Sequence, residues 1–318
     1  MIVALAGGVG GARLANGLAQ ILAPADLLIA VNTGDDFEQL GLAICPDIDT
    51  VTYTLAGLSD REWGWGIKSE TWNFVDSLRQ LGGPDWFALG DCYLAKHVLR
   101  TQPLRRGESL TAITREIARA SGIAHAIVPM SDDPVRTFIE TDEGLLPFQD
   151  YFVRRACQPV FTGIRFEGAA TARPASALVA ALGDPALDAI IICPSNPILS
   201  IGPMLAVPSL AEALRAAEVP CIAISPFIGG EAVKGPAGKI MPEQWISPGA
   251  AALAHPYAGT VDAILCDHAD ADAGRVIAGI HLVASDTQMR DDAGQQRLAR
   301  ECLALATSLH NPREQTVQ

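Results

Sequence analysis

Basic residues are few in this sequence: 23 lysines and arginines stand against 36 aspartates and glutamates in 318 residues, for a formal net charge of −13. Nucleic acids and anionic membrane surfaces are bound through basic faces, so this balance argues against both as partners. Phosphorylated small molecules remain open as ligands, because a metal ion, helix N-termini or a few placed cations can hold a phosphate locally.

Cysteine patterns typical of disulfide frameworks or zinc sites are also missing. The seven cysteines are odd in number, form no CxxC pair and have no zinc-ligand spacing. Reduced thiols of this kind are typical of a cytoplasmic protein, which is the location we expect. No apolar run reaches the roughly 18 residues of a membrane helix. The opening MIVALAGGVGGARLANG is broken by glycines and lacks the basic start of a signal peptide.

Apolar strands and helical segments alternate along much of the chain. MIVALAG and DLLIAVNTG are continuous apolar runs, and ARLANGLAQIL between them has helical spacing. The alternation becomes regular from about residue 173. We therefore predict an α/β fold, with a Rossmann-like, doubly wound and mainly parallel sheet. A single domain is expected over residues 1–318, with a mainly helical insertion at about 55–125. The segment YFVRRACQPV is also predicted to be strand-like.

Ligands of open α/β sheets bind at the carboxyl ends of the strands, so the residues after each strand are the first candidates. AGGVGGAR follows the first strand. Gly8 and Gly10 fit a dinucleotide-binding pattern, but Arg13 occupies the position of its third glycine. This loop is either a ligand contact or a tight turn.

Five carboxylates follow the second strand within VNTGDDFEQLGLAICPDIDT: Asp35, Asp36, Glu38, Asp47 and Asp49. One interpretation is that Asp35 or Asp36 caps a turn or helix. The other is a magnesium site formed by Asp35 and a carboxylate of CPDIDT, because magnesium takes few protein carboxylates and completes its shell with water and phosphate oxygens. Spacing alone leaves both open.

Two later loops offer polar groups for a diphosphate. PSNPILSIGPML places Ser195, Asn196, Ser200 and Gly202 after a strand, and FIGGEAVKGPAGKIM carries Lys234. Both are equally compatible with ordinary surface loops. EWGWGIKSETW concentrates three of the five tryptophans, which either stack on a flat ring or belong to a core. The sequence contains no GxSxG or HExxH motif, so serine hydrolase and zinc protease activities have little support.

Taken together, these motifs strongly resemble those of the 2-phospho-L-lactate transferase family of deazaflavin coenzyme biosynthesis. The matching segments occur in the family's order and cover nearly the whole chain: LAGGVGGARL, VNTGDDF, ICPDIDTVTYTL, GWGIKSETW, PDWFALGD, LAKHVLRT, PMSDDPVRT, FQDYFVRRA, PSNPILSIGPML and SPFIGG. The resemblance implies Mg²⁺-dependent transfer of a phosphorylated small acid from a guanosine-diphosphate-activated donor to the ribityl hydroxyl of a deazaflavin precursor. GMP is released. The acid is 2-phospholactate, phosphoenolpyruvate or 3-phosphoglycerate, and a homodimer is expected.

The resemblance also implies roles for individual residues. Asp35 and Asp49 are the expected Mg²⁺ ligands, and Asp35 or Asp36 is expected to orient or deprotonate the attacking hydroxyl. The expected nucleotide and phosphate contacts are Gly8, Gly10, Arg13, Ser195, Asn196, Ser200, Gly202 and Lys234. The expected deazaflavin contacts are Trp65, Glu70, Trp72, Asp91, His97 and Arg154. Cys92 stands where many relatives are expected to have a basic residue, which puts any contact of that side chain in doubt.

Two other functions are weighed against the transferase. Regulatory relatives with the same core bind nucleotide sugars without catalysis, but CPDIDT, GWGIKSETW and PDWFALGD resemble the transferase instead. An NAD(P)-dependent oxidoreductase is the second alternative. Arg13 argues against it, as does Asn32-Thr33 at the end of the second strand, where an acidic ribose ligand is usual.

Overall fold

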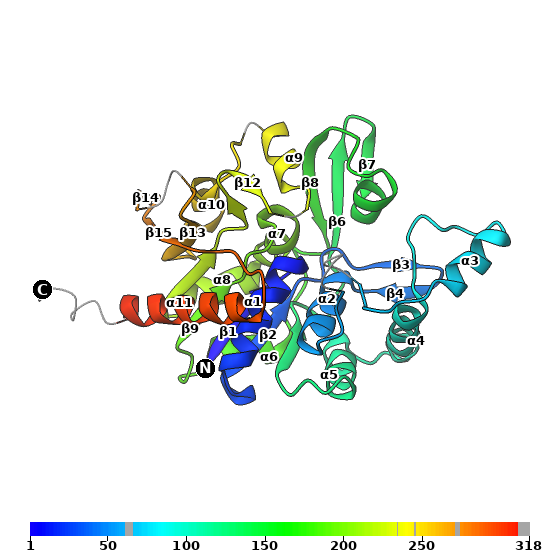
Figure 1. Cartoon of the computed structure of the whole chain (residues 1–318), viewed down its shortest axis with the longest axis horizontal. Coiled ribbons are helices and arrows are strands. Elements are labelled where there is room, and N and C mark those ends of the chain that lie inside the picture. Colours follow the sequence, from blue (N-terminus) through cyan, green and yellow to red (C-terminus); the bar gives the residue numbers. More distant parts are fainter. Residues whose placement is uncertain (61–65, 234, 245, 271–273, 311–318) are drawn as a thin grey trace, which may run out of the picture.

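The computed structural model describes residues 1–60, 66–233, 235–244, 246–270 and 274–310 (Figure 1). Its main feature is an eight-stranded sheet whose neighbouring strands are parallel except at the β14–β15 edge. Across the sheet the strands are β14 (Val276–Ile277), β15 (Ile280–Ser285), β13 (Ala263–Asp267), β10 (Cys221–Ile224), β9 (Ala189–Ile192), β1 (Ile2–Ala6), β2 (Leu27–Val31) and β5 (Ala126–Pro129). The predicted doubly wound, mainly parallel α/β fold is confirmed.

The central strands are buried on both faces, which explains their continuous apolar sequences. All five residues of β1 are buried: Val3 and Leu5 face one core, while Ile2, Ala4 and Ala6 face the other. The second core contains side chains of α1 (Gly8–Ile21), α2 (Pro46–Leu55), α5 (Leu110–Ala120) and α11 (Asp292–His310). The first contains side chains of α6 (Ser176–Leu182), α8 (Pro208–Ala216) and α10 (Ala250–Tyr257).

The segment between α2 and β5 includes three helices, namely α3 (Asn73–Gln80), α4 (Asp91–Arg105) and α5. Figure 1 shows α3 at the end of the molecule opposite the C-terminus. A short antiparallel hairpin, β3 (Phe37–Gln39) with β4 (Leu42–Ile44), precedes α2 and was not predicted. Its turn uses Leu40 and Gly41, both with positive φ. The division into domains stays a prediction.

A separate antiparallel sheet lies beside the main one and consists of β7 (Gly144–Pro147), β6 (Arg136–Thr141) and β8 (Phe161–Glu167). The strand-like prediction for YFVRRACQPV was wrong: none of residues 151–160 lies in a strand, and β8 begins only at Phe161. Asp150–Arg154 form a short π-helix, in which Phe152 stacks on Phe148 with ring centroids 5.4 Å apart. Short apolar runs do not distinguish helix from strand by periodicity, and here the i, i+4 aromatic pair favours the helix.

The remaining described elements are short and connect the layers. They are the 3₁₀ helix Pro24–Asp26, the π-helix Pro197–Ile201, α7 (Gly202–Leu205), α9 (Ala237–Glu243), β11 (Phe227–Ile228) and β12 (Glu231–Ala232). In the part of the chain that the structure describes, no single helix has the length and apolar character to cross a membrane. One pair bent by 87°, Pro197–Leu205 with Pro208–Ala216, passes that test jointly on length and composition.

The strand order reverses beside β1. From β1 the chain proceeds outward to β2 and β5, whereas β9, on the other side of β1, leads to β10, β13 and β15. The loops after β1 and β9 therefore leave the sheet in opposite directions and open a crevice at their carboxyl ends. This is where the fold places its candidate site.

Candidate functional site

A cavity of about 1330 Å³ opens at this crevice. Single small-ligand pockets are usually about 300–1,000 Å³, so the space suits a large ligand or two ligands together. Its lining combines the glycine loop and the loop after β9, here called the polar end, with a set of aromatic side chains, here called the aromatic end.

The glycines after β1 allow two backbones to approach closely. A Cβ at Gly10 would lie 2.2 Å from the Pro194 carbonyl oxygen, and one at Gly7 would lie 2.5 Å from Ser200 Cβ. Gly8 has φ +63° with open space around it, and both Gly8 and Gly10 line the cavity. The loop thus packs closely against the loop after β9 and also forms part of the cavity wall. The two interpretations of the sequence, a tight turn and a ligand contact, therefore do not exclude each other.

The loop after β9 forms the facing wall through Ser195, Asn196 and Ser200. Ser195 Oγ accepts a hydrogen bond from the Gly7 N–H at 3.1 Å. Asn196 Oδ1 accepts from the backbone N–H groups of the next turn at 2.9 and 3.0 Å, and its buried Nδ2 has no partner among the described residues. Gly202 begins α7 and is not a lining residue.

Two carboxylates lie together at the cavity wall, and the second is Asp47. The Asn32 amide Nδ2 donates to Asp35 Oδ1 at 3.1 Å and to Asp47 Oδ2 at 3.0 Å, while the Gly8 N–H donates to Asp47 Oδ1 at 2.7 Å. Burial raises the pKa of Asp47 to about 6. Burial, reinforced by the neighbouring charges of Asp47 and Asp36, raises the pKa of Asp35 well above its ordinary value.

Such a pair fits a divalent cation. A cation beside two buried like charges removes the repulsion that raises the pKa of Asp35, and magnesium uses only one or two carboxylates alongside water and phosphate oxygens. Groups of three or more His, Cys, Asp or Glu side chains in metal-binding arrangement are absent from the described ranges. A metal here would therefore need oxygen atoms from a ligand or from water.

Asp49 lies elsewhere than the sequence analysis expected. Both of its carboxylate oxygens accept hydrogen bonds from the Arg100 guanidinium, one from Nη1 at 3.0 Å and one from Nη2, and each side chain is 1% exposed. His97 Nδ1 lies 3.8 Å from the same carboxylate and is fully buried. Neither Asp49 nor His97 lines the cavity. The structure thus joins Asp35 with Asp47 rather than with Asp49.

Asp36 is buried directly behind this wall. Its Oδ1 has no hydrogen-bond partner among the described residues, and it is not a lining residue. Burial raises the pKa of Asp36 to about 7, against the opposing effect of the Arg136 charge. Of the two aspartates expected to be catalytic, only Asp35 reaches the cavity.

The other end of the cavity is aromatic. Its wall includes Trp72, Trp86, Phe87, Tyr93, Phe148 and Phe152. Trp72 was expected here from the resemblance, as was the segment GDCYLAKH that contains Tyr93; the other four were not predicted, although PDWF and FQDYF show the aromatic pairs in the sequence. Flat faces at one end of a large cavity suit a planar ring system.

Glu70 and Asp91 belong to a reciprocal capping arrangement. Glu70 lines the cavity and accepts from the Cys92 and Tyr93 N–H groups, at 2.8 and 3.0 Å, which begin α4. Asp91 Oδ1 accepts from the Phe74 N–H at 2.9 Å in the first turn of α3. The hydrogen bonds to Asp91, led by that from Thr71, lower its pKa to about 2. Asp91 is therefore placed to fix α3, and it does not line the cavity.

Of the remaining expected ligand contacts, some line the cavity and others do not. Arg13 lines the polar end of the cavity. Arg154 lies on the π-helix with a side chain 62% exposed, at 3.6 Å from Asp150, and does not line the cavity. Trp65 and Lys234 lie outside the described residues. Residues 287–290, after β15, also line the polar end and were not predicted, because their sequence carries no motif of its own.

Comparison with known proteins gives a consistent result. The family described as 2-phospho-L-lactate transferase CofD matches residues 2–303. Phosphoenolpyruvate transferase of Streptomyces griseus is 41% identical, over 96% of this chain and 98% of the relative. 2-Phospho-L-lactate transferase of Methanopyrus kandleri is 38% identical, over 97% and 98%. A crystal structure of a UPF0052-family protein from Bacillus halodurans has a TM-score of 0.62 at 14% identity, covering 95% of this chain and 98% of that one. That likeness concerns the fold alone.

Proposed function

The chain belongs to the 2-phospho-L-lactate transferase CofD family, whose members are transferases, and we propose that it transfers a phosphorylated small acid to a deazaflavin precursor. The proposed donor is the guanosine-diphosphate-activated acid, the acceptor is the ribityl hydroxyl, and GMP is released. Phosphoenolpyruvate and 2-phospholactate are the first two acids to consider, because the relatives are named for transferring them. 3-Phosphoglycerate is the third.

The observation that carries this proposal is a single large cavity whose lining is partly polar and partly aromatic. Its volume of about 1330 Å³ suits two substrates, and its polar and aromatic ends suit a nucleotide diphosphate and a deazaflavin ring respectively. Asp35 lines the same cavity and is the residue we propose to orient the attacking hydroxyl. Transfer between substrates held in one cavity gains from proximity and orientation.

We propose Mg²⁺ as the cofactor, held by Asp35 and Asp47. Asp49 is not proposed as a ligand, because Arg100 bonds both of its oxygens. A bound Mg²⁺ would neutralise charge on a diphosphate and on the leaving phosphate. Asn32 holds both carboxylates through one amide nitrogen, so this chain supplies their orientation without the metal.

A coupled assay tests the proposed function. Purified protein is mixed with the deazaflavin precursor, GTP, Mg²⁺ and a guanylyltransferase of relaxed specificity, and each of the three acids is supplied separately. A deazaflavin product heavier by one phospho-acid unit, detected by chromatography and mass, is the expected result. Formation of the donor in every tube with unmodified deazaflavin would contradict the transferase and favour a nucleotide-binding regulator.

We also propose a homodimer, as the resemblance implies. Light scattering coupled to size-exclusion chromatography tests it directly, since a monomer of 33.5 kDa and a dimer differ twofold in mass.

A further inference from the structure

The segment Ser285–Asp291 runs from the last residue of β15 to the start of α11. Thr287, Gln288, Met289 and Arg290 from this segment line the polar end of the cavity. Connecting loops are often mobile, yet a loop that binds a ligand well must hold its side chains in place. Contacts from β13, α11 and α1 fix this segment.

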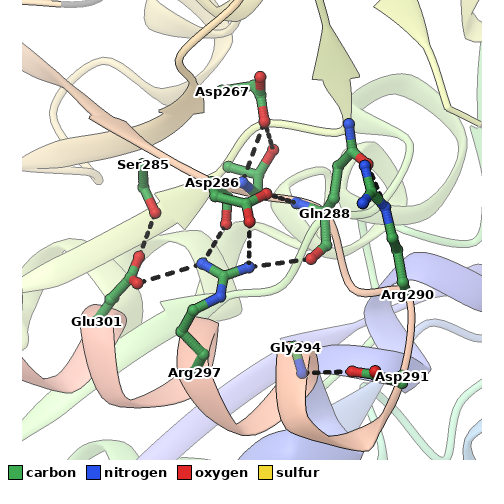
Figure 2. A network of polar contacts seen from close by, with 10 residues as sticks. Asp267, Ser285, Asp286, Gln288, Arg290, Asp291, Gly294, Arg297 and Glu301 are labelled. Carbon is green, nitrogen blue, oxygen red and sulfur yellow. Dashed lines mark hydrogen bonds and ion pairs between the residues drawn. The ribbon is translucent and has the colours of Figure 1, made fainter.

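Arg297 of α11 fixes the first half of the segment (Figure 2). Its Nη1 donates to the Asp286 carbonyl oxygen at 2.6 Å, and its Nη2 donates to the Gln288 carbonyl oxygen at 3.0 Å. The same guanidinium forms ion pairs with Asp286 Oδ2 at 3.1 Å and Glu301 Oε1 at 3.2 Å. One planar group thus holds two backbone carbonyls in a fixed relation, which a single ammonium does less well.

Three further contacts fix the rest of the segment. The N–H and the hydroxyl of Thr287 both donate to Asp267 Oδ2, each at 3.2 Å. Asp291 Oδ1 accepts from the Gly294 N–H at 2.8 Å in the first turn of α11. Met289 is buried, and its carbonyl oxygen accepts from Arg13 Nη1 at 3.4 Å. The segment is therefore connected to β13, α11 and α1.

Arg290 is the cationic residue of this segment that lines the cavity. Its Nε and Nη2 donate to Gln288 Oε1 at 2.9 and 2.5 Å, so the contact that orients it runs to a neutral oxygen (Figure 2). The contact that holds Arg13 also runs to a neutral oxygen, the Met289 carbonyl. Neither bond neutralises the positive charge of its guanidinium.

Charge at the cavity wall makes these two arginines distinctive. Among the described residues that line it, Arg13 and Arg290 are the cationic side chains, whereas the carboxylates are Asp35, Asp47, Asp60 and Glu70. Both arginines also line a small adjoining cavity of about 80 Å³, together with the carboxylates of Asp60, Asp291 and Asp292. In a protein of net charge −13, an anionic ligand in the main cavity is favoured on the part of the wall that carries these two cations.

We propose that Arg290 and Arg13 together bind the diphosphate of the donor nucleotide, and that Arg297 is a positioning residue for Arg290. A guanidinium binds phosphate oxygens in bidentate fashion, which fixes both charge and orientation. The identity of the ligand rests on the proposed function. The presence of an anion site does not.

The test is calorimetric titration of the full chain with three probes: GDP, inorganic pyrophosphate and guanosine. In Arg290→Gln, the affinities for GDP and pyrophosphate are expected to fall about tenfold or more, because charged hydrogen bonds to phosphate are lost. Guanosine affinity is expected to stay within about twofold, since guanosine carries no phosphate. Arg297→Gln is expected to show the same selective loss, with partial recovery in Arg297→Lys.

Arg300→Gln is the matched control. Arg300 lies on the same helix, donates to Gln296 Oε1 at 3.2 Å and does not line the cavity. Its substitution should leave all three affinities unchanged. An Arg290→Gln protein that binds GDP and pyrophosphate as tightly as the wild type would overturn the diphosphate assignment. An equal loss of guanosine and GDP affinity in Arg297→Gln would reduce that residue to a structural role.

The coupled assay separates this inference from the proposed function. If the wild type transfers a phospho-acid and Arg290→Gln does so with an unchanged KM for the donor, the inference fails while the transferase stands. If the wild type transfers none of the three acids but binds pyrophosphate through Arg290, the transferase fails while the anion site stands.

Discussion

Asp35 and Asp47 face one cavity and share one amide donor, and burial together with the charge of Asp47 raises the pKa of Asp35. Asp35→Asn and Asp47→Asn are each expected to reduce Mg²⁺-dependent transfer by about 100-fold or more, because a metal supplies several kcal/mol of charge stabilisation. Initial rates over a Mg²⁺ series measure this. Stability to urea should be unchanged or higher, since one of two buried like charges is removed. A wild-type rate in Asp47→Asn would exclude Asp47 from the metal site.

Asp49, two residues further along α2, is expected to behave in the opposite way. It forms a buried two-bond ion pair with Arg100, so Asp49→Asn leaves an uncompensated guanidinium in the interior. We expect a loss of about 3–5 kcal/mol in the free energy of unfolding, measured by urea denaturation. Asp35→Asn serves as the control of similar burial. Full stability in Asp49→Asn would show that the pair with Arg100 does not stabilise the fold.

The beginnings of α3 and α4 are held by carboxylates from outside each helix. Asp91, the first residue of α4, accepts from Phe74 N–H at 2.9 Å and Asn73 Nδ2 at 2.8 Å in α3, while Glu70 accepts from the first N–H groups of α4. Each helix start therefore depends on the other segment. This pairing places Trp72, which directly precedes α3, at the aromatic end of the cavity.

This capping predicts a pH dependence. The pKa of Asp91 falls from 3.8 to about 2 on folding, chiefly through its hydrogen bond from Thr71. A lowered pKa means that the ionised group favours the folded state. Its stabilisation is fully present above about pH 4 and is lost as the pH falls through about 2. Melting temperatures of wild type and Asp91→Asn should differ at pH 5 and converge towards pH 2; an equal difference at every pH would contradict the assignment.

At the scale of the whole molecule, we expect the aromatic and polar ends of the cavity to bind their ligands independently of each other. Trp72→Ala should weaken deazaflavin binding by about two- to tenfold, which corresponds to an aromatic contact of about 0.5–1.5 kcal/mol. GDP affinity should not change. Fluorescence titration of the deazaflavin and calorimetry with GDP measure the two effects. Leu81→Ala is the matched control on the same helical segment, because Leu81 is 86% exposed and does not line the cavity.

If Trp72→Ala instead lowers both affinities equally, the two ends do not act independently. That outcome would favour a single ligand spanning the cavity. It would leave the fold and the family membership as they are.

Local sequence patterns were sufficient to predict the main sheet and several of the loops that line the cavity. Continuous apolar runs such as IVALA and LLIAV identify strands buried on both faces, and the glycine loop after β1 marks where a ligand can approach. The acidic segment after β2 supplies Asp35 and Asp47 to the cavity wall, as expected for residues at the carboxyl ends of parallel strands, which share one edge. These features depend on residues that are close in the sequence, so a local sequence pattern is enough to predict them.

Local patterns could not decide whether Asp47 or Asp49 lies beside Asp35 at the cavity wall. Both lie in PDIDT at the start of α2, and their environments differ because residues distant in the sequence reach them: Asn32 and Gly8 contact Asp47, while Arg100 contacts Asp49. The same holds for Arg290, which lines the cavity on a loop that hydrogen-bonds to the distant residues Arg297 and Asp267. A carboxylate's role depends on the charges and donors packed around it, and those come from the tertiary structure.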